Sequence, residues 1–281
     1  QYVHTFDKCF FMPSDLTAGL EYNRDRLKDN MWGYDRHTDQ TVNIYSAFLQ
    51  NEWKNDRWGI LIGGRLDKHN MVDNVIFSPR ANLRFNPTQN INLRLSYSSG
   101  FRAPQAFDED MHIENVGGTV AMIERAKNLK EEKSQSFSAS ADMYHRFGVF
   151  QTNFLIEGFY TRLTDVFVLG EPYDRGDGIL VKTRSNGAGA KVMGLTLEGK
   201  VAYLSILQIQ AGLTLQRSRY DEPHKWHDDA PAEKKIFRTP DTYGYFTATY
   251  TPIKPLSIAL SGTYTGRMFV QRMDIPAENA E

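Results

Sequence analysis

The sequence predicts an all-β protein, specifically an antiparallel up-and-down β-barrel that crosses a membrane. Three observations support this prediction. Apolar residues recur at every second position, the expected strands are long, and short and long connections alternate along the chain. A transmembrane barrel carries its lipid-facing residues at alternate positions, so its mean hydropathy resembles that of a soluble protein.

The alternation is clearest in three segments. Within 91–98, Ile, Leu, Leu and Tyr alternate with Asn, Arg, Ser and Ser, and the same pattern recurs in 207–216 and 257–264. A period of two places successive side chains on opposite faces of a strand. Each segment is therefore expected to have one apolar face and one polar face.

The same pattern, followed along the whole chain, predicts about twelve strands. Many of them have ten or more residues, which is the length that a tilted strand needs to cross the hydrocarbon layer. The expected strands are 1–9, 15–26, 41–53, 57–67, 76–85, 90–100, 132–146, 148–166, 179–203, 206–220, 238–251 and 255–270.

The connections between these strands form a second pattern. Short turns at 11–14, 54–56, 86–89, 146–147, 204–205 and 251–254 alternate with longer charged segments at 27–40, 68–75, 101–131, 167–178 and 221–237. Strict alternation places every short turn at one end of an up-and-down sheet, as in outer-membrane barrels. A soluble sandwich has Greek-key crossings and no reason to sort its connections by length.

Aromatic residues next to the short turns favour the same interpretation. They are expected to form a girdle at one membrane interface, although core packing in a soluble β protein remains an alternative. The residues are Trp53, Trp58, Phe85, Tyr144, Phe147, Tyr203 and Tyr250.

Composition excludes several other classes of protein. The formal net charge is −1 with no clustered basic run, which argues against nucleic-acid binding. The single cysteine, Cys9, cannot form an internal disulfide. No stretch approaches the roughly 18 apolar residues of a membrane-spanning helix. The start at Gln1 lacks the features of a signal peptide, so a mature form or a fragment is expected.

Several motifs resemble the TonB-dependent outer-membrane receptor family, over about residues 41–270. Ser96–Pro104 ends in the four residues of the family's FRAP box, and 127–134 (KNLKEEKS) is similar to its NPNLKPEKS box without the prolines. Similar stretches are Phe48–Lys54, Ile60–Asp67, Phe77–Arg80 and Asn186–Gly194.

The resemblance implies a partial barrel domain over 1–281, the central to C-terminal part of a larger receptor. It would hold about 12 strands of a 22-strand barrel, with the plug domain and the N-terminal TonB box absent. The implied partners are the TonB complex, the receptor's own plug, the lipid bilayer and a metal-chelate ligand. The implied location is the bacterial outer membrane.

The resemblance also implies a function, the import of a scarce and bulky metal chelate by TonB-dependent gating. A corrinoid, a ferric siderophore and haem all remain open as ligands. The alternative from another class is a structural or glycan-binding β-sheet protein of the cell surface. No catalytic constellation, nucleophile elbow or phosphate loop is present in the sequence, so we expect no enzyme.

Candidate ligand-binding residues fall mainly in the long segment 101–131, because connections of this length are usually functional or disordered. The resemblance makes His112 a candidate haem ligand, since the family's haem receptors carry a histidine between the two boxes. The other candidates in the extracellular loops are Phe101, Arg102, Asp108, Asp110 and Trp226.

Two loop clusters are candidate metal sites. His224, His227 and Asp228 offer imidazole and carboxylate groups to a transition metal. The acidic residues around 108–110 offer oxygen ligands for bound calcium, although no cofactor is required by the expected function. Solvated, charged loop tips are the simpler interpretation of both clusters. Arg80, Arg84 and Arg94, on the polar face, are expected to contact a plug or an anionic ligand.

Overall fold

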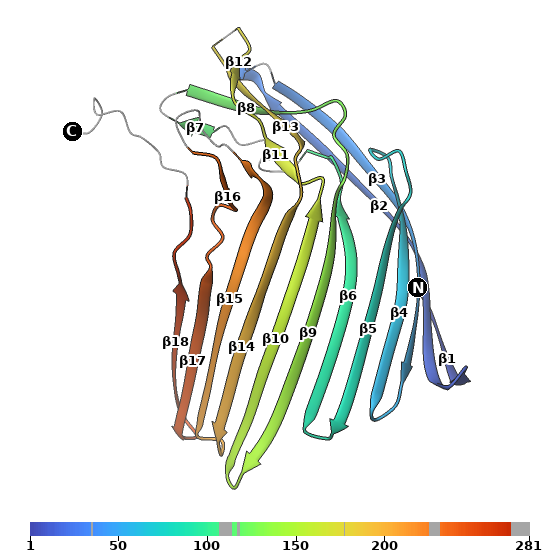
Figure 1. Ribbon diagram of the computed structural model, residues 1–281, viewed down its shortest axis with the longest axis vertical. Helices are drawn as coiled ribbons and strands as arrows, with labels where there is room; N and C mark the ends of the chain where they lie inside the picture. The colour runs from blue at the N-terminus through green and yellow to red at the C-terminus, as the bar shows by residue number, and fades with distance from the viewer. Residues whose placement is uncertain (35, 107–113, 117–118, 177, 225–230, 271–281) are drawn as a thin grey trace, which may run out of the picture.

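A computed structural model of the protein describes residues 1–34, 36–106, 114–116, 119–176, 178–224 and 231–270. The chain forms a tall curved sheet whose strands run side by side, with a small second sheet across one end (Figure 1). Among the described residues, the large sheet has 13 strands and the small one has 5. The expectation of an all-β antiparallel sheet of about twelve long strands is confirmed.

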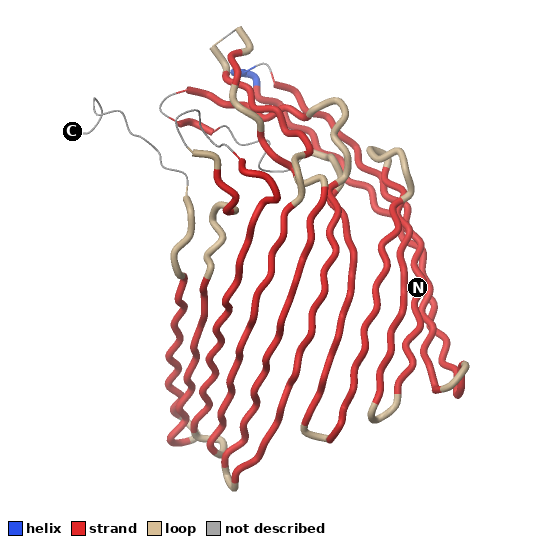
Figure 2. The backbone as a smooth tube through the Cα atoms, in the orientation of Figure 1, coloured by secondary structure: helices blue, strands red, loops and turns tan. Residues whose placement is uncertain are grey.

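Strands of the large sheet pair antiparallel with their neighbours along the path from β1 to β18. The short turns gather at the end opposite the small sheet (Figure 2). The strands are β1 (Tyr2–Cys9), β2 (Met12–Met31), β3 (Arg36–Lys54), β4 (Trp58–His69), β5 (Ile76–Thr88), β6 (Ile91–Arg102), β9 (Glu132–Phe147), β10 (Phe150–Thr164), β14 (Ala190–Tyr203), β15 (Leu207–His224), β17 (Thr242–Ile253) and β18 (Leu256–Thr265), with β16 (Glu233–Lys235) beside β15.

The small sheet was not expected from the sequence: four of its strands lie in the long connections 101–131 and 167–178, and the fifth lies in the expected strand 179–203. It contains β7 (Glu114–Val116), β8 (Thr119–Arg125), β11 (Phe167–Leu169), β12 (Tyr173–Asp174) and β13 (Leu180–Asn186), with β8 and β13 parallel. A 3-10 helix, η1 (Trp32–Tyr34), lies between β2 and β3. No helix of the described residues is long and apolar enough to cross a membrane.

The prediction of one strand over 179–203 is wrong. Residues 180–186 form β13 of the small sheet, and 190–203 form β14 of the large one. Between them, a Cβ at Gly189 would lie 2.5 Å from the carbonyl oxygen of Leu163 and 2.7 Å from Oδ2 of Asp221, so only glycine fits this close approach. Both segments have an extended backbone, and the sequence alone does not show that they belong to different sheets.

The two faces of the large sheet differ as the alternation predicted. Register aligns Leu195 with Leu215 and Leu197 with Leu213 on one face. On the other face, Thr196 and Thr214 are paired through their hydroxyls at 3.0 Å. Leu213 is 40% exposed and Thr214 only 6%. Side chains crowd together on the concave side of a curved sheet, so the polar face is the inner one.

Aromatic residues border the apolar outer face at both ends. Near the short turns, Trp58 stacks on Phe85 with ring centroids 4.3 Å apart, and Phe150 contacts Tyr203 at 5.0 Å. Ten positions further along β10, Tyr160 begins the opposite border, a separation of roughly 33 Å along the strand. Such a band, flanked by aromatic girdles, is typical of a membrane barrel.

One expected girdle residue is misplaced. Tyr144 pairs with Asn153 and its hydroxyl donates to Asp142 Oδ2 at 2.9 Å, which places it on the polar inner face. Its neighbour Met143 takes the outer position. The prediction relied on the position of Tyr144 next to a short turn. That position does not specify on which face of the sheet the side chain lies.

The assignment of faces predicts the effect of charge at two adjacent positions. We expect Leu213→Arg in the full-length protein to lower the free energy of unfolding by about 2–4 kcal/mol, because the guanidinium would enter hydrocarbon near the midplane. Thr214→Arg should cost much less, because its side chain extends into the interior. Denaturant titration in lipid vesicles measures both, and equal costs would contradict the assignment.

Candidate functional site

The polar inner face carries a charge network, formed by Glu21, Ser46, Arg65 and Asp67, close to the end of β4 that leads into a long connection. Their strands β2, β3 and β4 are neighbours, and register places Ser46 opposite both Glu21 and Asp67. Arg65 lies two residues before Asp67, so the two side chains share one face. The alternation of three strands thus brings four polar side chains together.

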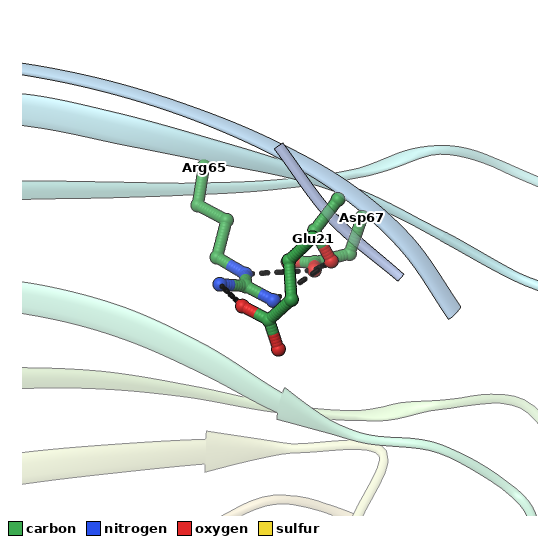
Figure 3. Close-up of polar contacts among 4 residues, drawn as sticks. Glu21, Arg65 and Asp67 are labelled. Carbon is green, nitrogen blue, oxygen red and sulfur yellow. Dashed lines mark hydrogen bonds and ion pairs between the residues drawn. The ribbon is translucent and has the colours of Figure 1, made fainter. Parts of the chain in front are cut away.

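Arg65 is the centre of this network (Figure 3). Its Nε donates to Asp67 Oδ1 at 2.8 Å, its Nη1 to Glu21 Oε2 at 2.9 Å and its Nη2 to Ser46 Oγ at 2.7 Å. Ser46 Oγ in turn donates to Asp67 Oδ1 at 2.6 Å. The Asp67 side chain is 3% exposed, whereas those of Arg65 and Glu21 are 36% and 50% exposed.

The network joins strands and presents charge to the interior of the sheet. A buried carboxylate needs such partners, because a charge without them is costly in a low-dielectric environment. One guanidinium between two carboxylates leaves one net negative charge facing inward. The four groups contain no activated nucleophile, so the arrangement is suited to recognition and packing.

A polar cavity of about 790 Å³, here called the rim cavity, lies at the end of the large sheet next to the small sheet. Its walls come from the start of β3, the loop after β4, the segment 104–106 and the residues from Met122 to Leu129. Its ionisable side chains are mainly basic: Arg125, Lys127 and Arg175 are cationic and His37 is an imidazole, with Glu124 the one carboxylate among the described lining residues.

Gln40 holds the walls of the rim cavity together. Its side-chain oxygen accepts from Arg125 Nη1 at 2.8 Å and from the Ala106 amide at 2.9 Å. Arg125 also donates to the Pro104 carbonyl oxygen at 3.0 Å. Gln40 is 8% exposed, so these bonds are made in a buried setting, where leaving them unmade is costly.

His69, at the end of β4, forms a second link to the same wall. The Met71 amide donates to His69 Nδ1 at 3.0 Å, so Nε2 carries the proton and donates to Gln105 Oε1 at 3.3 Å. The side chain is fully buried, and burial lowers its pKa, although the Gln105 bond opposes this effect. Protonation of Nδ1 would break the bond from Met71.

The structure places two of the expected ligand-binding residues in packing contacts. Phe101 packs against the small core of Val72, Ile76 and Ala103. The guanidinium of Arg102 lies 5.6 Å from the centre of the Phe167 ring, within range of a cation–π interaction. Both residues therefore support the base of the loops at this end of the sheet.

Most of the remaining expected site residues lie outside the described part of the chain, namely Asp108, Asp110, His112, Trp226, His227 and Asp228. His224 ends β15, with its ring 6.0 Å from that of Tyr220, and burial lowers its pKa. In the described ranges, no three potential metal ligands gather into a group.

The three arginines expected on the polar face do lie there. Arg84 and Arg94 are directly opposite one another on β5 and β6, and Arg84 Nη2 donates to the Asn55 carbonyl oxygen at 3.0 Å near the short turns. Arg80 is paired with Ser98. Like charges in direct opposition are unfavourable in isolation, which is consistent with a face that meets a further charged group.

Sequence reasoning did not single out Gln40, His69 or the charge network. A partial signal was present in the segment Ile60–Asp67, which resembles the family. Arg65 and Asp67 are two residues apart there, so both charged side chains are expected on the same, polar face of the strand. Gln40 carries no comparable signal. Its role depends on Arg125 and Ala106, which are 85 and 66 residues away in the chain.

Comparison with known proteins gives one family. The family model "TonB dependent receptor-like, beta-barrel" matches residues 2–277. No curated protein matches the chain.

Solved structures resemble the fold at low sequence identity. The siderophore receptor PirA from Pseudomonas aeruginosa matches 92% of this chain at 17% identity and a TM-score of 0.71, and PirA from Acinetobacter baumannii matches 95% at 16% and 0.69. The alcaligin outer-membrane receptor FauA from Bordetella pertussis matches 94% at 15% and 0.62. The chain spans 47%, 41% and 45% of these receptors, respectively.

The charge network predicts unequal effects of two substitutions. Arg65→Ala should lower the free energy of unfolding by about 2 kcal/mol, because Asp67 then stays buried without its cation; the partial exposure of Arg65 reduces the loss. Glu21→Gln should cost under about 1 kcal/mol, because that carboxylate is half exposed. Denaturant titration of the full-length protein measures both, and equal losses would argue against a central role for Arg65.

The burial of His69 predicts that the stability of the fold depends on pH. The pKa of a free histidine is about 6.5, and burial lowers it in the fold, so the unfolded state binds the proton more readily. Stability should therefore be complete above about pH 6.5 and decline as the pH falls below that value. His69→Gln should flatten this decline, whereas His37→Gln, at an exposed position, should not.

Hydrogen exchange of segments 69–76 and 103–106 between pH 7.5 and 5.5 is the appropriate measurement. Protection in the unsubstituted protein should decrease toward the acid end of this range. Identical pH profiles for the unsubstituted protein and His69→Gln would show that another group is responsible.

Proposed function

The chain belongs to the TonB-dependent receptor family of the outer membrane, and from this premise we propose that it is part of a receptor that imports an anionic metal chelate, of the ferric siderophore class. Size explains the need for such a receptor, since bulky chelates exceed what diffuses through a general porin. Import consists of opening the receptor and moving the chelate across the outer membrane, and the chelate undergoes no covalent change. Membership of this family of transporters favours import over an enzyme and over the glycan-binding alternative.

The observation that carries the proposal is the basic character of the rim cavity. Arg125, Lys127, Arg175 and His37 surround about 790 Å³ at the end of the sheet where the long connections gather. A cavity of this size suits a small-molecule ligand. Clustered cationic groups favour an anionic ligand and raise its rate of encounter at low ionic strength.

The descriptions of two matched structures indicate which ligand class to test first. PirA is described as a siderophore receptor and FauA as the alcaligin receptor. Their identity to this chain is 17% and 15%, which supports a common fold and not a common ligand. A corrinoid or haem therefore stays an alternative to be tested alongside a ferric chelate.

The inner face suggests how ligand binding is communicated to the rest of the receptor. We assign the face that carries Arg80, Arg84, Arg94 and the charge network to contact with a plug domain, supplied by the part of the receptor outside this chain. The TonB complex would act on that plug. The bonds of Gln40 and His69 hold segment 103–106 against β3 and β4, so they keep the cavity in shape while ligand enters.

The loop residues expected from the sequence keep their proposed roles. Phe101, Arg102, Asp108, Asp110, His112 and Trp226 remain proposed ligand contacts, with Phe101 and Arg102 at the base of the long connection. His224, His227 and Asp228 remain a proposed metal site, and the acidic loop a proposed calcium site. None of these is required for the import mechanism above.

Removing one charge from the rim cavity tests the proposal. Lys127→Ala in the full-length receptor should weaken the binding of a ferric tris-catecholate by about threefold to tenfold, because one charge-assisted contact contributes on the order of 1 kcal/mol. Added salt should reduce the difference. Lys254→Ala, in an exposed short turn at the opposite end, is the matched control.

Haem and cyanocobalamin are titrated in parallel by fluorescence quenching. Tight binding of haem or cyanocobalamin, with no binding of the ferric chelate, would reject the siderophore class and leave the import function standing. Unchanged affinity of Lys127→Ala for every ligand would reject the rim cavity as the site.

A further inference from the structure

The inner face of the large sheet carries a strip of very small side chains on two neighbouring strands, β6 and β9 (Figure 1). Between Arg94 and Arg102, every inward position of β6 and each of its partners on β9 is serine or glycine. The strip extends for about 20 Å along the strands. Its residues, here called the serine track, are Ser96, Ser98, Gly100, Ser134, Ser136, Ser138 and Ser140.

The serine track faces the interior as a smooth polar wall. Ser140 is opposite Arg94, which lies on the inner face, and none of the track residues is buried. Ser96 Oγ lies 2.6 Å from Ser138 Oγ, and Ser136 Oγ lies 3.0 Å from Thr161 Oγ1. A hydroxyl both donates and accepts, so these paired groups can share a further bond with a polar ligand without requiring one. The wall therefore has weak affinity for polar groups along its whole length.

Two large inward side chains on the flanking strands are turned away from the track. Phe159 of β10 is opposite Ser138, but a Cβ built on Gly194 of β14 would lie 2.5 Å from its Cζ, so the ring lies over Gly194. On the other side, Arg84 of β5 extends toward β4, because a Cβ built on Gly59 would lie 3.0 Å from its Nε. Neither side chain covers the serine track.

The serine track leads from the rim cavity toward the short-turn end. β6 ends at Arg102, and Pro104 and Ala106, which follow it, line the rim cavity. Beside the track, Arg80 of β5 is opposite Ser98, so a guanidinium is placed where it attracts an anion.

The lower end of the track has a different charge. There the carboxylate of Glu157 is opposite Ser140 and opposes Arg94 on the other side, so retention of an anion at this end is disfavoured. The order of charges therefore favours movement of an anion away from the rim cavity.

A wall of serine and glycine also gives a plug domain little to hold. Short side chains bury little surface and make few close contacts, so each contributes little to adhesion. The charge network and the inward arginines offer much stronger contacts elsewhere on the same face. Separation of a plug from the wall should therefore cost least along the serine track.

We propose that the serine track is the wall along which the chelate moves from the rim cavity toward the short-turn end when the plug is displaced. This proposal rests on the import function proposed above and adds the path and the residues that line it. Conduction requires contacts weak enough for the ligand to leave each position, which paired hydroxyls provide. The chelate moves without the making or breaking of a covalent bond.

A bulky substitution tests the path. In cells that carry the full-length receptor and an energised inner membrane, Ser138→Trp should reduce uptake of a radiolabelled ferric tris-catecholate by about fivefold or more, with its affinity changed by less than about twofold, because the indole narrows the passage below the binding site. Ser261→Trp is the matched control. Ser261 of β18 also lies on the inner face, opposite Thr247, but away from the track.

Cysteine labelling tests the same path without blocking it. In a receptor with Cys9→Ser, Ser138→Cys should react several times faster with a membrane-impermeant maleimide during import than in the absence of chelate. Ser261→Cys should react at the same rate under both conditions. Exchange of serine for cysteine replaces one atom, so both variants should keep the fold, and their chelate affinity checks this.

Uptake of haem and cyanocobalamin is measured in parallel, so that failure of the path is distinguished from failure of import. If the unsubstituted receptor imports none of the three chelates, the import function and the path are both rejected. If it imports one of them, and Ser138→Trp and Ser138→Cys behave as Ser261→Trp and Ser261→Cys do, the path is wrong and import stands. Should Ser138→Trp lose chelate affinity, the two cysteine rates decide: equal rates reject the path, and a faster rate at position 138 supports it.

Discussion

The structure depends above all on backbone hydrogen bonding in a medium without water. In lipid, each strand must find its partners within the protein, so only closed sheets and helices can span a membrane. The antiparallel path from β1 to β18 meets this requirement for every strand between its two edges. β1 and β18 stand at the ends of that path in the described residues, and this chain spans less than half of the receptors that it resembles.

Once the strands are paired, alternation decides what each face can do. Inward positions carry the network of Arg65 and Asp67, where a buried carboxylate is held by a guanidinium and a hydroxyl. Outward positions carry leucine and aromatic side chains up to the level of Tyr160, and basic side chains beyond it. Because side chains alternate between the two faces of each strand, the same strands present one face suited to a plug and another suited to lipid.

The end with the long connections combines rigidity with an open cavity. Gln40 and His69 use buried hydrogen bonds to hold segment 103–106, so the walls of the rim cavity do not rest on loop conformation alone. The small sheet adds further backbone bonds between connections that are distant in sequence, such as β8 and β13. The histidine bond also makes one of these links sensitive to acid, because it needs the neutral ring.

The sequence by itself determined the fold class, the long strands, the polar and apolar faces and the family, because these follow from local alternation and short motifs. It placed Arg80, Arg84 and Arg94 on the inner face correctly, since that assignment needs only parity. Tertiary structure alone decided that 180–186 leaves the large sheet, that Gln40 meets Arg125, and that the inward serines of β6 and β9 form one track. The reason is physical: alternation reports the direction of a side chain from its own strand, whereas its neighbours depend on which strands pair and in what register.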